Sequence, residues 1–376
     1  MSAEPTVVIW RSALLAASET FVRNHGAALT RWRPRYLGAT KVESNLAEDG
    51  DVIAFRDPRA FLRLRLTGSS PRLRAALAGL APQVVHAHFG GDGWLVSRAA
   101  ADLGVPLVVT VHGHDVTRQP DAPGLHGVRY RRNLRAVFRR AAVVLAVSEH
   151  IRATAIARGA DPATVRVHHT GVPIPDAVPD VPKTWDVAFV GRFVEKKGAG
   201  DLLAALALMP GRPRALIIGS GPLEDELRAR AAGLDVTFAG PQTPQQVARH
   251  LAGSRILAAP SRTARDGDSE GLPTTILEAA ALGLPVAATR HSGIPEGVLD
   301  GETGLLSAEA DPDGLAANLT RMLDDDALRA RLGARGRAHV EASFDLRKQS
   351  SLLEDLYDEL AVSRAACGAG RRPASR

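Results

Sequence analysis

The chain has 376 residues, of which 45% are hydrophobic and 23% charged, as expected of a globular protein long enough for two domains. Its single cysteine, Cys367, excludes an intramolecular disulfide and a cysteine-built zinc site, and fits a reducing cytoplasm. No apolar run is long enough to cross a bilayer and we identify no signal peptide, so we expect a cytoplasmic protein.

The net charge of +6 is unevenly distributed. Residues 1–178 carry 23 Lys and Arg against 14 Asp and Glu, whereas the remainder carries 24 against 27. Two stretches, Arg56–Arg74 and Arg129–Arg140, hold six arginines each. One interpretation is a set of solvated helix faces, and the other is peripheral contact with an anionic membrane.

Short apolar runs alternate with helical stretches along the whole chain, which predicts βαβ units and parallel sheets. In the first half we predict strands at Thr6–Trp10, Val84–His88, Leu107–Val111 and Val143–Val147, and helices that include Trp94–Leu103 and Tyr130–Arg140. In the second half we predict strands at Trp185–Val190, Arg214–Ile218, Val236–Ala239, Arg255–Ala259 and Pro285–Ala288, and helices at Ala199–Met209, Pro222–Ala232, Pro244–Ala252 and Pro273–Leu282.

A proline-rich stretch between Gly171 and Pro182 predicts an interdomain linker. We therefore expect an N-terminal domain over 1–178 and a C-terminal domain over 183–346, both α/β and doubly wound, facing each other across a cleft. A final helix over 347–366 is expected to pack on the first domain, and a basic tail over 367–376 to be disordered.

The segment Asp268-Ser-Glu-Gly-Leu-Pro-Thr-Thr-Ile-Leu-Glu278 combines a helix start with polar groups. Pro273 suits the first turn of a helix, and Gly283 suits its end. Gly271 and Leu272 then lie at the helix entry, where backbone N–H groups and the helix dipole favour an anion.

Two carboxylates, Glu270 and Glu278, flank this helix entry. They are useful there if the ligand offers hydroxyl groups as well as phosphate, as a nucleotide sugar does. On spacing alone, an ordinary acidic helix start with a solvated glutamate explains them equally well.

Glu270-x7-Glu278 resembles the paired-glutamate signature of retaining glycosyltransferases of the GT4 family, which have the GT-B fold of two Rossmann-like domains. Further segments resemble the same family: Val190–Gly198, Ile218–Leu223, His291–Glu296 and the His-x-Gly within His169–Val172. The resemblance spans both halves and implies that the C-terminal domain binds the donor and the N-terminal domain the acceptor.

The resemblance implies that Arg192 and Lys197 bind the donor diphosphate, the first as a bidentate fork and the second as a point charge. It assigns Glu278 to the ribose and Glu270 to the transferred sugar. The implied donor site is Gly191, Arg192, Lys197, Gly219, Gly221, Pro222, Glu270, Gly271, Leu272, Pro273, Thr274 and Glu278. The implied catalytic residues are His112, Arg192, Lys197 and Glu270.

Gly219-Ser-Gly221 begins like a dinucleotide-binding loop but lacks the third glycine, so we expect no NAD. An alternative is that this turn borders the nucleobase. His86 and His88 lie on a predicted strand, and His112-Gly-His114-Asp115 follows the end of another. Such a set can bind a metal or consist of satisfied, partly buried histidines. We find no complete ligand set and expect neither a metal nor another cofactor.

In the family, the histidine that matches His112 lies beside the donor sugar, and the neighbouring Asp115 is an acceptor-side candidate. The loop after the first strand lacks the glycine pair of many relatives. It carries instead Ser18 as an expected helix cap, followed by Glu19 and Thr20. We place Glu19 and Thr20 on the acceptor side, together with His88. This variant and His88-Phe-Gly90 resemble the exopolysaccharide branch of GT4, with its colanic-acid-type transferases.

These expectations describe a retaining, metal-independent transferase that moves a hexose-type sugar from a UDP-, GDP- or TDP-sugar, with UDP favoured. The acceptor is a hydroxyl of a saccharide, a lipid-linked compound or a natural product. Two other classes stay open: a GT-B nucleotide-sugar epimerase or hydrolase, and a non-catalytic basic protein that binds membrane or nucleic acid. Aromatic residues make up only 4% and no nucleic-acid motif occurs, so we expect no nucleic-acid partner.

Overall fold

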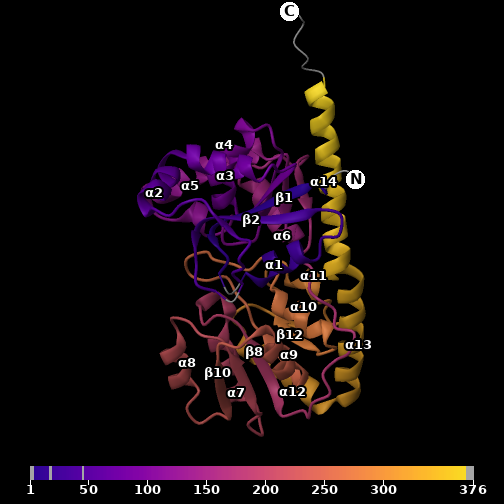
Figure 1. Ribbon diagram of the computed structural model, residues 1–376. Helices are drawn as coiled ribbons and strands as arrows, with labels where there is room; N and C mark the ends of the chain where they lie inside the picture. Colours follow the sequence, from indigo (N-terminus) through magenta and orange to yellow (C-terminus); the bar gives the residue numbers. More distant parts are fainter. Residues whose placement is uncertain (1–3, 17–18, 45, 370–376) are drawn as a thin grey trace, which may run out of the picture. The chain divides into compact units, whose positions relative to one another are not determined.

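The computed structural model describes residues 4–16, 19–44 and 46–369, and the chain falls into two compact units (Figure 1). Unit 1 comprises Met1–Gly171 and Leu346–Arg376, and unit 2 comprises Val172–Asp345. The chain therefore leaves unit 1 once and returns to it once. None of the described helices is long and apolar enough to span a bilayer.

Within its described residues, unit 1 has a seven-stranded sheet in the order β3-β2-β1-β4-β5-β6-β7, with every neighbouring pair parallel. The strands are β1 (Thr6–Leu14), β2 (Arg33–Lys41), β3 (Val52–Ile53), β4 (Val84–His88), β5 (Leu107–Val111), β6 (Val143–Ala146) and β7 (Val165–Val167). The chain order reverses between β1 and β4, so the topological switch point lies where their carboxyl ends meet.

The central strands β4, β5 and β6 are buried along their whole length, as helices on both faces of a parallel sheet require. The covering helices are α1 (Thr20–Ala27), α2 (Pro58–Thr67), α3 (Pro71–Gly79), α4 (Gly90–Asp102), α5 (Gly124–Arg140), α6 (Glu149–Ala157) and α14 (Leu346–Ala369), and a 3-10 turn, η1, spans Gln119–Asp121. Asp57 and Ser70 cap α2 and α3, and a proline opens each helix.

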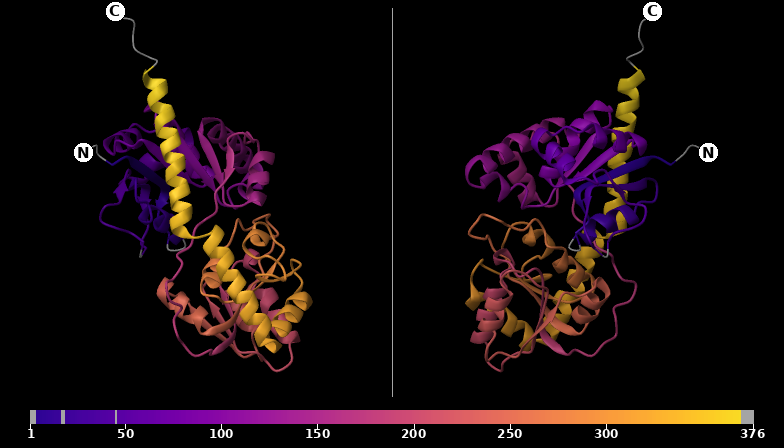
Figure 2. Two further views of the ribbon diagram at one scale, coloured as in Figure 1. Left: turned by 90° about the vertical axis from the view of Figure 1, so that its right-hand side faces the viewer. Right: turned by 60° about the vertical axis from the view of Figure 1, so that its left-hand side comes forward.

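The last helix, α14, belongs to the core of unit 1 although it is separated from the rest in sequence (Figure 2). Leu353, Leu356 and Tyr357 pack with Val84 and Val108 of the sheet. The buried Tyr357 hydroxyl lies 2.6 Å from Nδ1 of His86 on β4. The helix begins at Leu346 and reaches Ala369, so the first three residues of the segment expected to be disordered are helical; residues 370–376 lie outside the described part.

Unit 2 is described throughout and has a six-stranded parallel sheet in the order β10-β9-β8-β11-β12-β13. Its strands are β8 (Trp185–Val190), β9 (Ala215–Ile218), β10 (Val236–Gly240), β11 (Ser254–Ala259), β12 (Val286–Thr289) and β13 (Gly304–Ser307). Its helices are α7 (Ala199–Leu208), α8 (Glu224–Arg230), α9 (Pro244–Ala252), α10 (Thr274–Ala281), α11 (Ile294–Gly297), α12 (Pro312–Asp324) and α13 (Asp326–Ser343), and the 3-10 turn η2 spans Glu195–Lys197. Here the switch point lies between β8 and β11.

The chain passes between the units at residues 171–172 and 345–346, and at each crossing the first residue contacts the unit that it enters. Val172 N–H donates to Phe344 O at 2.8 Å inside unit 2. Gly171 lies so close to Leu346 that an added Cβ would approach its Cα to 2.7 Å. Residues 173–184, which include most of the proline-rich stretch, form no helix or strand.

We predict that Tyr357→Phe destabilises unit 1, because it leaves the buried His86 Nδ1 without its partner. The expected loss is about 1–3 kcal/mol in the free energy of unfolding, measured by urea denaturation. Ser363→Ala, which removes an exposed hydroxyl from the same helix, is the control and should change it by less than about 0.5 kcal/mol. Equal stabilities of Tyr357→Phe and wild type would contradict the role of this contact.

Candidate functional site

The sequence-predicted donor residues gather at the carboxyl edge of the unit 2 sheet, on the loops after β8 and β11. Arg192 and Lys197 follow β8, whereas Glu270 and the start of α10 follow β11. These strands flank the switch point, where open parallel sheets bind ligands. The fold thus brings together groups that are far apart in sequence.

An ion pair joins the two loops: Lys197 Nζ lies 3.0 Å from Glu270 Oε1. Burial opposes ionisation of the Glu270 carboxyl, but the charges of Lys197 and Lys196 outweigh it and hold its pKa below the usual value. Lys196 also contacts Asp268 at 3.1 Å. Two adjacent lysines therefore favour the ionised form of Glu270.

The same oxygen of Glu270 still has hydrogen-bonding capacity. Lys197 pairs with Oε1 as a cation, and by hydrogen-bond geometry this buried atom has no donor among the described residues. A buried carboxylate oxygen without a donor is costly. A ligand hydroxyl would satisfy it.

The backbone of Glu270 is fixed by His291, at the carboxyl end of β12. Glu270 N–H donates to His291 Nε2 at 3.1 Å, so this nitrogen is an acceptor and the ring proton is on Nδ1. Nδ1 donates in turn to Glu309 Oε1 at 2.7 Å, and Thr263 N–H donates to Glu309 Oε2 at 2.7 Å. The Ser292 hydroxyl also donates to the carbonyl of Glu270. The position of Glu270 therefore depends on residues after three strands.

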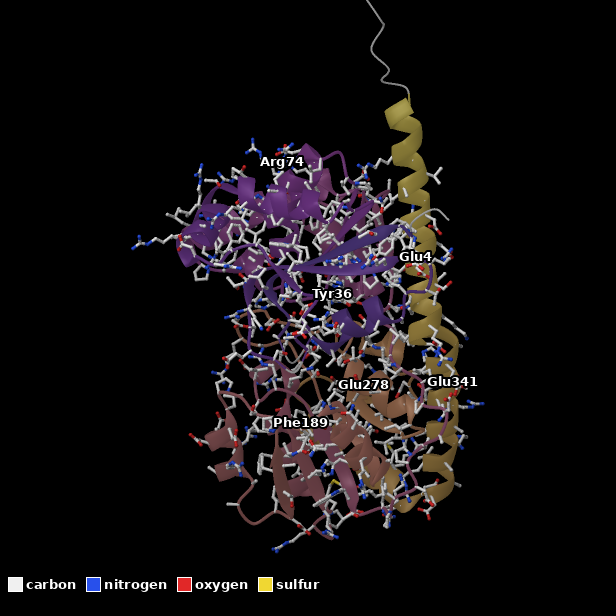
Figure 3. All side chains as sticks on the ribbon, viewed as in Figure 1. Glu4, Tyr36, Arg74, Phe189, Glu278 and Glu341 are labelled. Carbon is white, nitrogen blue, oxygen red and sulfur yellow. The ribbon has the colours of Figure 1, made fainter. Side chains whose placement is uncertain are left out.

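Helix α10 starts directly beyond this loop, with Pro273 at its N-cap position and no side-chain cap. The first amides of a helix have no partner within it and can face a ligand. Leu272 is buried in an apolar cluster with Val172 and Leu277, so only its backbone is available. Glu278 (labelled in Figure 3) lies one turn into α10, where burial raises its pKa against the opposing effects of Thr274 and Lys197.

Arg192 is exposed, and no hydrogen bond or ion pair of its side chain occurs within unit 2. The stem of Lys197 passes over Gly191, with Cδ 3.4 Å from where a Cβ would lie. Gly219 and Gly221 have a clear packing function, because Cβ atoms there would lie 2.0 Å from Gly191 O and 2.6 Å from Phe193 O. These glycines let the loops after β8 and β9 pack together, and Pro222 beside them is exposed.

In unit 1, His88 and His112 end neighbouring strands and form a pair. His88 Nδ1 and His112 Nε2 lie 3.1 Å apart, so one nitrogen carries a proton and the other accepts it. Burial lowers the pKa of His112 to about 3, and the charge of Arg11 adds to the shift. Burial also holds the pKa of His88 well below its usual value. His112 is partly exposed, whereas His88 lies beneath it.

Glu19 does not face solvent as an acceptor-side residue would. It is 8% exposed and pairs with both Nε and Nη2 of the buried Arg11. Arg11 Nη1 also pairs with Asp92 on α4. Glu19 occupies the N-cap position of α1 without a side-chain cap bond, and the expected cap, Ser18, lies outside the described residues. Thr20 is partly exposed at the helix start.

Asp115 is 2% exposed and has a structural task. Its carboxylate accepts from the N–H groups of Gly90 at 2.8 Å and of His112 and Gly113 at 3.0 Å. It therefore fixes the loop that carries His112 and offers little to an acceptor. Among the described residues, no group of three or more His, Cys, Asp or Glu could hold a metal ion.

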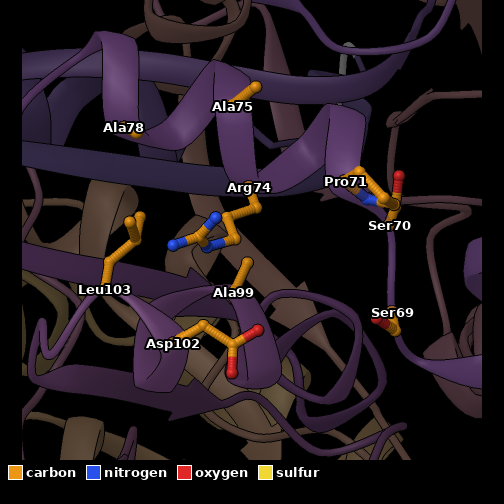
Figure 4. Close-up of a pocket in the computed structure, with 9 residues that line it drawn as sticks. All are labelled: Ser69, Ser70, Pro71, Arg74, Ala75, Ala78, Ala99, Asp102 and Leu103. Atoms are coloured by element: carbon orange, nitrogen blue, oxygen red, sulfur yellow. The ribbon is translucent and has the colours of Figure 1, made fainter.

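A cavity of about 290 Å³ lies between α3 and α4 of unit 1 (Figure 4). Arg74 and Asp102 contribute its charged groups, and alanines line much of the rest. None of the sequence-predicted site residues borders it. The cavity is therefore distinct from the sites described above.

Sequence reasoning missed the groups that support the site. The sequence did not indicate a role for Arg11, because no known motif spacing relates it to its partners Glu19 and Asp92. His291 lies in a family-like segment and could have been singled out, but its partner Glu309 follows a strand that we did not predict.

A family model described as "Glycosyl transferases group 1" matches residues 184–325, and one described as "Glycosyltransferase Family 4" matches residues 19–174. Together they cover more than half of the chain. The matches divide as the two units do, with one in each half.

Among similar proteins, the amylovoran biosynthesis glycosyltransferase AmsK of Erwinia amylovora is 30% identical over 73% of this chain and 69% of that protein. A GDP-mannose-dependent monoacylated alpha-(1-6)-phosphatidylinositol monomannoside mannosyltransferase of Corynebacterium glutamicum is 34% identical over 66% of this chain and 69% of that protein. HepE of Anabaena, solved in complex with UDP, shares the fold with a TM-score of 0.78 at 18% identity, over 94% of this chain and 100% of that chain. The chain therefore belongs to glycosyltransferase family 4, as a glycosyltransferase with the two Rossmann-like domains of the GT-B fold.

Proposed function

We propose that this glycosyltransferase moves a hexose-type sugar, with retention, from a nucleoside-diphosphate sugar to a hydroxyl group of a saccharide, lipid-linked or natural-product acceptor. The observation that carries the proposal is the cluster of Arg192, Lys197, Glu270 and the α10 start at the switch point of unit 2. This cluster offers cations and amides for phosphate, and carboxylates for hydroxyl groups.

Arg192 and Lys197 are assigned to the diphosphate. Arg192 is exposed and offers a planar fork, whereas Lys197 is a point charge already held at the site by Glu270. Together with the first amides of α10 they neutralise the charge that develops on the leaving diphosphate. The proposed reaction therefore needs no metal ion and no cofactor besides the donor.

Glu270 is assigned to the transferred sugar, because its buried Oε1 lacks a hydrogen-bond donor that a sugar hydroxyl can supply. Glu278, one turn further along α10, is assigned to the ribose. His112 is assigned to the donor sugar as a neutral ring, able to donate or accept a hydrogen bond but not to supply a charge.

We propose front-face substitution, the mechanism that the family resemblance implies, and both carboxylates of the site, Glu270 and Glu278, are assigned to hydroxyl groups of the donor. The bond between the anomeric carbon and the diphosphate oxygen breaks, and a bond from that carbon to the acceptor oxygen forms on the same face. The acceptor proton passes to the leaving diphosphate. The role of unit 2 is to stabilise that leaving group and orient the sugar.

UDP is the proposed nucleotide, supported by the UDP bound to HepE, a protein of the same fold. GDP is a second candidate nucleotide, because the C. glutamicum relative is GDP-mannose-dependent. The sharpest experiment incubates the protein with UDP-, GDP- and TDP-sugars, and measures nucleotide release and the shift in Tm. No release and no shift with any of them would reject the proposal and favour a non-catalytic protein, whereas an isomerised sugar nucleotide would indicate an epimerase.

We also propose peripheral contact with an anionic membrane through α2 and α5 of unit 1. Leu62, Leu66, Leu125 and Val128 are between 53% and 88% exposed, and α2 and α5 contain no acidic residue. Arg129 on α5 donates to the carbonyl of Leu66 on α2 at 3.1 Å, so the exposed apolar residues belong to neighbouring helices rich in arginine. Apolar side chains among arginines suit an anionic lipid surface.

Lys197→Ala and Arg192→Ala should each lower kcat at least about 100-fold, because each removes a preorganised charge at the leaving group. Glu278→Ala should raise the donor KM about tenfold or more through loss of the ribose contact. Arg228→Ala, which breaks an exposed ion pair on α8 of the same unit, is the control and should leave both constants unchanged. Near-normal kinetics of all three site variants would show that the donor binds elsewhere.

Glu309→Gln should lower kcat about tenfold while the Kd of the free nucleoside diphosphate changes less than about twofold. Glutamine has one acceptor oxygen and cannot serve both His291 Nδ1–H and Thr263 N–H, so Glu270 shifts against the sugar and not against the phosphates. Glu302→Gln, the same change at an exposed residue of the same unit, is the control. A parallel rise in Kd would show a general collapse of the site.

The double variant Leu62→Ser/Leu66→Ser should reduce binding to vesicles that contain phosphatidylglycerol at least about fivefold. Wild-type binding should also fall as salt screens the arginines. Leu208→Ser is the matched control, since Leu208 in unit 2 is 55% exposed as well. Equal wild-type binding to neutral phosphatidylcholine vesicles would contradict an electrostatic contact.

A further inference from the structure

A cluster of aromatic rings lies at the switch point of unit 1, and the assignment of His112 to the donor sugar leaves its two phenylalanines without a role. The rings of Phe21 and Phe89 lie 4.8 Å and 4.6 Å from the ring of His112, measured between centroids. All three side chains are partly exposed. They come from α1, from the end of β4 and from the end of β5, so the fold itself assembles them.

The backbone of Phe89 is strained, with φ 71° and ψ 137°. Such a conformation is ordinary for glycine and rare for a bulky residue. Gly90 and Gly91 follow directly, so the chain has glycine next to this position and still places an aromatic residue on it. Strain of this kind persists where the side chain has a task, which here is to hold the ring beside His112.

The charges around the cluster do not suit an anionic ligand. The guanidinium of Arg11 lies 4.3 Å from the centroid of the Phe89 ring, and it is the cation that acts on His112. Glu19 and Asp92 both bind this guanidinium. The group therefore carries two negative charges for one positive charge, and a phosphate would be repelled there.

We propose that Phe21 and Phe89, which both pack against His112, form the acceptor platform and bind the apolar face of an uncharged sugar ring. Aromatic faces are electron-rich and attract the C–H groups that a pyranose presents on one side, while its hydroxyl groups point outward. This proposal rests on the proposed glycosyltransferase function and names its acceptor class: a neutral saccharide terminus, as opposed to an inositol phosphate. The partly exposed His112 keeps its assignment to the donor sugar, beside the platform.

The test uses the full chain and saturation-transfer NMR with irradiation of aromatic protons. The probes are methyl glucoside, methyl galactoside, methyl mannoside and myo-inositol 1-phosphate. At least one methyl glycoside should receive saturation on its carbon-bound ring protons, and the inositol phosphate should receive less. Absence of saturation for every glycoside, or tighter binding of the inositol phosphate, would overturn the proposal.

Phe89→Gly and Phe21→Leu should each raise the Kd of the bound glycoside about five- to tenfold. Glycine adopts the φ angle of Phe89 without strain, so this change removes the ring and does not strain the backbone. Phe61→Leu is the control: this ring is also partly buried in unit 1 and pairs with Phe55 at 5.9 Å. Unchanged Kd values in both platform variants would reject the platform.

The nucleotide-induced shift in Tm, measured on the same samples, separates this proposal from the proposed function. Platform variants should keep the wild-type shift, because the donor residues belong to unit 2. Loss of glycoside binding with a normal nucleotide shift therefore bears on the acceptor alone. A wild-type protein that binds glycosides but responds to no UDP-, GDP- or TDP-sugar would leave the platform intact and reject the transferase.

Discussion

A carboxylate buried in a protein stays ionised only if positive charge compensates for the lost water, and Glu270 meets this requirement through Lys197. The pair holds the η2 turn after β8 against the loop before α10, so the loops on the two sides of the switch point are joined by one contact. His291 and Glu309 hold the backbone of the same residue. The site is thus organised around one side chain whose neighbours set both its charge and its position.

Unit 1 has the same kind of doubly wound sheet, but the charges at its switch point differ from those of unit 2. The pKa values of His88 and His112 are lowered, so both rings are neutral, and the buried Arg11 is paired with two acids. Positive charge is therefore available at the sheet edge of unit 2, whereas at that of unit 1 the arginine is paired with two acids. This contrast fits a division of labour in which one unit handles phosphate and the other handles uncharged groups.

The sequence was most informative where one local rule dominated. Apolar β-branched runs predicted the central strands. Pro273 and Gly283 predicted the two ends of α10 to within one residue. β2 was missed because arginine and proline interrupt its pattern, and β1 runs to Leu14 because ion pairs allow Arg11 to be buried within the strand. The motif residues of unit 2 meet as expected. Sequence spacing did not reveal that Asp115 and Glu19 are buried and paired inside unit 1, because it does not relate Asp115 to Gly90 or Glu19 to Arg11.

The discontinuity of unit 1 has a consequence for how the protein is made. Residues 172–345 are synthesised and can pack their own core before α14 leaves the ribosome, although residues 1–171 were synthesised earlier. Until then the sheet face that Leu353, Leu356 and Tyr357 cover stays open to water. The half synthesised first is therefore completed last, and during this interval the nascent chain offers an apolar surface for chaperones or for misassociation.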